Sequence, residues 1–125
     1  MAAPNIVNVT TITGVTTAVS IANANTSNVI VSNAASSNKV LKINTILAAN
    51  IDGAADADVT IKWCNAAAGA GTSFAIANTV KVAPDSTLVA IGKDSPIYLE
   101  ENRSIIALAS AANDFVVICS YEEIS

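Results

Sequence analysis

The residue types that most enzymes use for catalysis are scarce in this chain, and histidine is absent. Without an imidazole, Ser-His-Asp and Cys-His nucleophiles and histidine-bound metal sites are excluded. The two thiols belong to Cys64 and Cys119. Strand alternation places Cys119 on an apolar face and Cys64 on the face opposite Trp63. We therefore expect two free thiols that lie on different sides of a β-sheet. Cys119 then acts as a small core hydrophobe, and Trp63 as a core anchor rather than a ligand platform.

The carboxylates do not have the spacing of a catalytic pair. The segment Asp52–Asp58 carries three aspartates around a glycine, but it lacks the EF-hand spacing and the bidentate glutamate, which favours a solvated hairpin tip over a calcium site. Glu100-Glu101 and Glu122-Glu123 are neighbours whose side chains face opposite sides of a strand, so neither pair shares a proton. Gly69-Ala70-Gly71 lacks the lysine and the helix of a phosphate-binding loop. We therefore predict no catalytic residue, no cofactor, no metal site and no small-molecule substrate.

The composition favours a protein that functions as part of a larger assembly. The 125 residues fit one domain, and only 13% are charged although 52% are apolar. A surface built from Ala, Ser, Thr and Asn loses little when it is covered, because few ions must be desolvated. The net charge of −4 and the scattered lysines argue against a nucleic-acid partner.

The chain begins without the basic and apolar regions of a signal peptide, and no apolar run is long enough for a membrane helix. We expect a soluble protein that is made in the cytoplasm and does not bind a membrane.

Short runs rich in β-branched residues alternate with Asn-, Ser-, Gly-, Asp- and Pro-containing turns, which predicts strands. The predicted strands are Ile6–Thr13, Val15–Ile21, Asn28–Ser32, Lys39–Asn50, Val59–Cys64, Phe74–Val82, Thr87–Ile91, Ile97–Leu99, Ser104–Ser110 and Phe115–Tyr121. This spacing predicts an all-β fold: one antiparallel β-sandwich domain over residues 1–125, of the jelly-roll or immunoglobulin-like type. Residues 1–14 form either an edge strand or an extended N-terminal arm.

The longest run, Lys39–Asn50, is apolar on parts of both faces, which suits a central strand. Strict alternation divides its residues into two sets: Leu41, Ile43, Thr45 and Leu47 on one face, and Val40, Lys42, Asn44 and Ile46 on the other.

Three stretches of the chain carry a family resemblance: MAAPNIVNVTTITG at residues 1–14, PIYLEENRSI at 96–105 and ICSYEEIS at 118–125. The chain resembles the small β-rich virion structural proteins of tailed bacteriophages, particularly those of cyanophages. Members of that family often carry an acidic residue where this chain has Arg103, so no role for that turn is carried over. The resemblance implies a particle component that is present in many copies and has no enzymatic activity.

Under this resemblance, the leading hypothesis is a capsid decoration (cement) protein on the outer surface of the virion. It would be made in the host cytoplasm, form a homotrimer and bridge neighbouring copies of the major capsid protein. The alternatives are a neck, tail or fibre component, and an adhesive or carbohydrate-binding β module. The predicted contact residues are Ala2, Ala3, Pro4, Asn5, Ile6, Val7, Tyr121, Glu122, Glu123 and Ile124.

Overall fold

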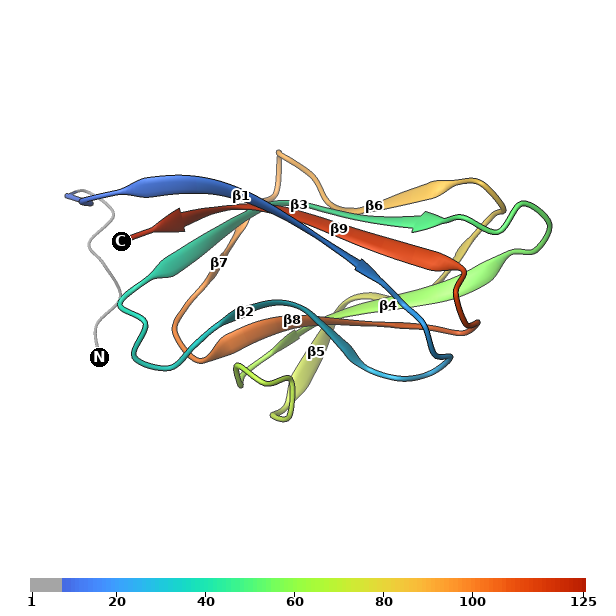
Figure 1. The fold of residues 1–125 in the computed structure, drawn as a ribbon, viewed down its shortest axis with the longest axis horizontal. Coiled ribbons are helices and arrows are strands. Elements are labelled where there is room, and N and C mark those ends of the chain that lie inside the picture. Colours follow the sequence, from blue (N-terminus) through green and yellow to red (C-terminus); the bar gives the residue numbers. More distant parts are fainter. Residues whose placement is uncertain (1–7) are drawn as a thin grey trace.

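The computed structural model describes residues 8–125, which fold into two antiparallel sheets packed face to face (Figure 1). Every regular element in this range is a strand, which confirms the predicted single-domain β-sandwich. The strands are β1 (Ile12–Ser20), β2 (Asn28–Asn33), β3 (Val40–Asn50), β4 (Ala57–Cys64), β5 (Ser73–Val82), β6 (Thr87–Ile91), β7 (Ile97–Leu99), β8 (Arg103–Ala109) and β9 (Phe115–Ile124). No helix in the described range is long and apolar enough to cross a membrane.

The strand order is that of a jelly roll. One sheet has the order β1-β9-β3-β6, with β7 also paired to β3, and the other has the order β2-β8-β4-β5. The pairs β1–β9, β2–β8, β3–β7, β3–β6 and β4–β5 are nested, as if one long hairpin had been rolled up. The added pairs β3–β9 and β4–β8 join the middle of each sheet, so β3 is central, as predicted.

The core lies between the two sheets and is built mainly of Ile, Val, Leu and Ala. Its largest buried side chains include Phe115, Ile43, Ile46 and Ile105, all with no exposed surface. Trp63 is half-buried and packs against this core, so its role as an anchor is confirmed. Each sheet therefore has one dry face.

The predicted faces of β3 are wrong beyond Ile43. A bulge lies between Ile43 and Thr45, where the pairing with β9 shifts by one residue. Beyond it, Ile46 and Ala48 are buried, whereas Leu47 points away from the core. A bulge adds one residue to one strand and reverses the alternation, which a period-2 pattern cannot anticipate.

β1 runs straight through Gly14, where the sequence predicted a break between two strands. Gly14 pairs with Glu122 of β9, and its backbone is not in the left-handed region. A glycine in an extended conformation interrupts no ladder, so the strand continues from Ile12 to Ser20.

The segment 65–72 folds back over the outer face of the β2-β8-β4-β5 sheet. The hydroxyls of Ser32 and Ser104 donate to the carbonyls of Ala67 and Ala66, both at 2.6 Å. Gly69 has φ +74°, and a Cβ there would lie 2.9 Å from Cγ2 of Ile106. The segment 65–72 is therefore a packed cover for this end of the sheet.

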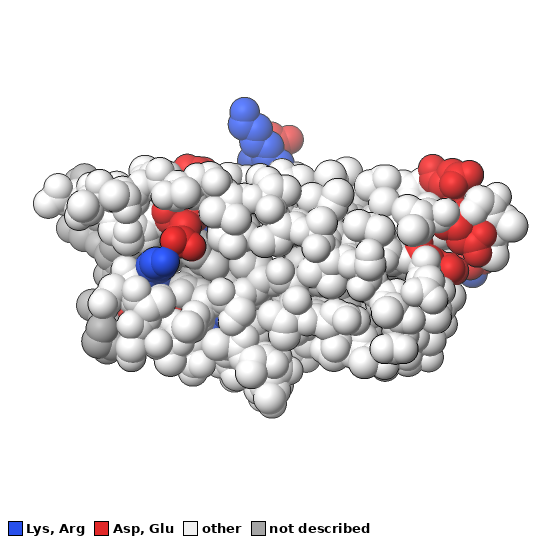
Figure 2. Space-filling model, in the orientation of Figure 1, with Lys and Arg blue, Asp and Glu red and all other residues white. Residues whose placement is uncertain are grey.

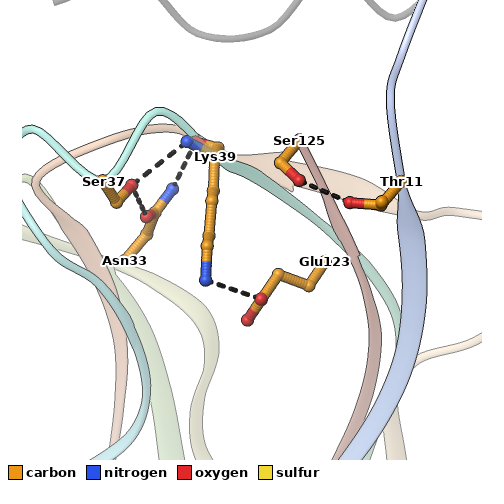
Figure 3. A network of polar contacts seen from close by, with 6 residues as sticks. All are labelled: Thr11, Asn33, Ser37, Lys39, Glu123 and Ser125. Carbon is orange, nitrogen blue, oxygen red and sulfur yellow. Dashed lines mark hydrogen bonds and ion pairs between the residues drawn. The ribbon is translucent and has the colours of Figure 1, made fainter.

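Two buried asparagines end the strands β2 and β3 and fasten the loops that follow. The Asn33 amide donates to the carbonyls of Lys39 and Leu99 at 2.9 and 3.0 Å, and the Ser37 hydroxyl donates to its Oδ1 (Figure 3). The Asn50 amide donates to the carbonyls of Ala55 and Val82 at 3.1 and 3.0 Å. Each amide satisfies carbonyls that would otherwise be buried without a partner.

Candidate interface

The two thiols do not form a reactive site. Cys119 lies in the core, where burial raises its thiol pKa to about 12. Cys64 faces outward from its sheet but has no exposed surface, because the segment 65–72 covers that face. Both cysteines are free, as predicted. Within residues 8–125, no three His, Cys, Asp or Glu side chains gather in a way that could hold a metal ion.

A cavity of about 250 Å³ opens at strands β4 and β5. Its lining includes Asp58, Thr60, Lys62 and Thr79. Thr79 has φ +50°, but its amide donates to the Thr60 hydroxyl at 3.0 Å, so this strained residue serves the bulged pairing of the two strands. The contact between Thr60 and Thr79 at this cavity thus belongs to the pairing of β4 and β5, and we assign no reaction to the cavity.

The predicted contact residues fall into two groups. Ala2 to Val7 lie outside the described residues. Tyr121 to Ile124 form the end of β9, which is flanked by β1 on one side and β3 on the other. Within this segment, Glu123 pairs with the Lys39 ammonium at 2.7 Å (Figure 3) and Ile124 is buried. The backbone of this segment is thus already paired on both sides, and its contacts with another chain stay a prediction.

Three of the four sheet edges carry features that discourage a further strand. β2 has six residues and a register shift between Val29 and Val31. β5 has two register shifts against β4 and carries Lys81. β6 and β7 form one edge of β3 that is interrupted by the turn at residues 92–96. Short strands, bulges and charges are the usual protection of sheet edges.

The fourth edge, β1, has none of these features. Its nine residues pair with β9 in unbroken register and include no charged side chain and no proline. Within residues 8–125 no strand pairs with its other side. A long, regular, uncharged edge of this kind is a template for another strand.

The free backbone groups of β1 can be assigned from the ladder. Thr11 and Ser125 exchange two backbone hydrogen bonds, at 2.9 and 3.0 Å, so the odd-numbered residues of β1 bond to β9. The even-numbered residues therefore direct their N–H and C=O groups away from β9. These residues are Ile12, Gly14, Thr16, Ala18 and Ser20.

The edge strand β1 and the strand β2 beside it carry no charged residue. β1 and β2 lie next to each other at one side of the sandwich. Residues 1–38, which contain both strands, include no Lys, Arg, Asp or Glu. Figure 2 shows charged side chains near both ends of the molecule and in one group that projects from the middle of the upper rim, with an uncharged surface across the middle of the view below that group. This long charge-free stretch is the feature of the sequence that marks the β1 edge, although it contains no reactive residue type such as Cys, Asp, Glu or Lys.

Comparisons with known proteins support the fold assignment but do not assign the chain to a family. No protein-family model matches the chain, and no curated protein matches it. The fold is similar to that of a solved structure described as "Bacillus endospore appendages form a novel family of disulfide-linked pili", with a TM-score of 0.53 and 17% sequence identity. The match covers 92% of this chain and 88% of that chain. At this identity the likeness carries the β-sandwich fold alone.

This finding corrects the leading functional hypothesis. The fold neighbour is a subunit of an appendage and not a capsid decoration protein, which contradicts the predicted cement function. We set that function aside together with its neck, tail and adhesive alternatives. The resemblance to virion proteins, the virion location, the homotrimer and the capsid partner are not tested by these comparisons and stay predictions.

Proposed function

We propose that this protein is a non-catalytic structural subunit that assembles with copies of itself into an extended, appendage-like polymer. The single observation that carries this proposal is the unprotected edge of β1. The appendage described for the fold neighbour supports it at the level of architecture.

A second copy is the partner that best fits the β1 edge. An antiparallel pair of β1 strands about a two-fold axis at Thr16 sets Thr16 opposite Thr16, Gly14 opposite Ala18 and Ile12 opposite Ser20. All five residues direct their backbone groups to this edge, so the ladder is self-complementary. No like charges meet at the axis, because β1 has none.

The assembly we propose does not need disulfide bonds. The fold neighbour is described as disulfide-linked, but both cysteines of this chain have no exposed surface. Neither sulfur can reach a neighbouring chain without local unfolding. We expect the polymer to persist in a reducing buffer.

The proposal is tested at Thr16, whose N–H points away from β9. Thr16→Pro removes that donor and places a ring against an incoming strand, without removing a backbone hydrogen bond to β9. We expect wild-type protein to form extended polymers in negative-stain electron microscopy and multi-angle light scattering. We expect Thr16→Pro to form none.

Thr16→Val is the matched control. It loses the same bond from the Thr16 hydroxyl to Ser120 but keeps the backbone N–H, so it should assemble like the wild type. Thr16→Lys is a second blocking variant, because it sets two ammonium groups side by side at the two-fold axis. Circular dichroism and thermal unfolding test whether each variant is folded. Monomeric wild-type protein, or Thr16→Pro polymers equal to those of Thr16→Val, would refute the proposal.

A further inference from the structure

The outer face of the β1-β9-β3-β6 sheet carries an apolar row that crosses four strands. Register sets Ala18 beside Ile118, Ile118 beside Leu47, and Leu47 beside Val89. None of these four side chains belongs to the core. Val89 is 58% exposed.

A second row lies one step further along the strands. It contains Ser20, Val116, Ala49 and Thr87, again without a charge. A sandwich that works as a monomer presents alternating polar residues on its outer faces. These two rows are instead suited to contact with another protein surface.

Two charged residues of the strands themselves lie toward the other end of this face, and they have opposite signs. Lys42 of β3 lies directly beside Glu122 of β9. The amide of Asn44 donates to the Glu122 carboxylate at 2.9 Å, which holds that carboxylate in place.

We propose that this face binds the same face of a second copy about a two-fold axis that runs along the strands between β9 and β3. This axis sets β3 of one copy on β9 of the other and β6 on β1. Leu47 then meets Ile118, Val89 meets Ala18, and Lys42 meets Glu122, so both the apolar rows and the charges are complementary.

This inference rests on the proposed function and explains how pairing at β1 becomes a polymer. A single two-fold interface stops at a dimer. The β1 axis is perpendicular to the sheet, whereas the second axis lies parallel to the strands and is displaced by about 10 Å, or two strand spacings. Because the two axes do not meet, alternation of the two contacts produces an open two-layered ribbon.

The test uses Thr16→Pro protein, in which only the face contact remains. We expect Thr16→Pro to be a dimer in sedimentation equilibrium, and Thr16→Pro with Val89→Asp to be a monomer, with the dimer weakened at least about tenfold. Thr16→Pro with Ile51→Asp is the control, because Ile51 is also 58% exposed but lies in the loop after β3. It should remain a dimer. In the wild-type background, Val89→Asp should stop assembly at the β1 dimer.

Charge exchange identifies the partner as a second copy. In the Thr16→Pro background, Lys42→Glu makes both charged positions acidic, and Glu122→Lys makes both basic. Each variant alone should be a monomer in about 20 mM salt, and an equimolar mixture should form a heterodimer. If a substitution abolished the dimer only by disturbing its own chain, mixing the two variants would not restore a dimer.

The outcomes separate the two proposals. Monomeric Thr16→Pro protein beside wild-type polymers overturns the face contact but leaves the proposed function standing. Wild-type polymers that survive Thr16→Pro overturn the proposed function. Failure of the charge variants to associate when mixed, while Thr16→Pro alone dimerises, refutes the axis between β9 and β3.

Discussion

At the scale of single residues, the core thiol makes the stability of this protein depend on alkaline pH. Burial raises the pKa of Cys119 from 9.0 to about 12, so the folded state keeps a proton that the unfolded state loses. Stability is therefore complete below pH 9 and falls as the pH rises toward 12, by up to about 1.4 kcal/mol per pH unit. The pKa of Tyr121 is also raised by burial and by Glu123, which adds to the decline above pH 10. Urea unfolding at pH 8, 9 and 10 measures this loss.

Cys119→Val is the control, because it fills a similar volume without a titratable group. Its free energy of unfolding should decline less between pH 9 and pH 10 than that of the wild type. Equal slopes for the two proteins would show that the thiol titrates normally in the folded state.

At the scale of elements, the packing of the segment 65–72 requires a glycine at position 69. Gly69→Ala places a Cβ 2.9 Å from Ile106 and 3.3 Å from Val29, at a φ of +74° that L residues avoid. We expect a loss of roughly 1–3 kcal/mol in the free energy of unfolding. The matched control is Gly14→Ala, since nothing lies within 4 Å of a Cβ at Gly14. Its effect should stay within about 0.5 kcal/mol, and equal losses for both variants would contradict a packed role for this segment.

At the scale of the whole molecule, the position of the charges predicts how assembly responds to salt. Both proposed contacts involve strands with few charges: β1 has no charged residue, and β3 and β9 contribute one pair to the outer face, Lys42 and Glu122. The polymer should therefore change its association constant by less than about threefold between 50 and 500 mM sodium chloride. Light scattering across that range measures it. Dissolution of the polymer at high salt would assign the assembly to the charged ends of the molecule instead.

The sequence by itself determined the β-sandwich, its central strand and its free thiols. Those features follow from side-chain alternation and turn residues, which are local properties of the chain. Only the tertiary structure decided which strand is the open edge. An edge strand lacks a partner on one side, and the partners of a strand can lie far away in the sequence: β1 pairs with β9, near the other end of the chain. It also decided that Leu47 joins the outer apolar row, since the bulge after Ile43 is a response to the twist of neighbouring strands and leaves no mark on the pattern of residues.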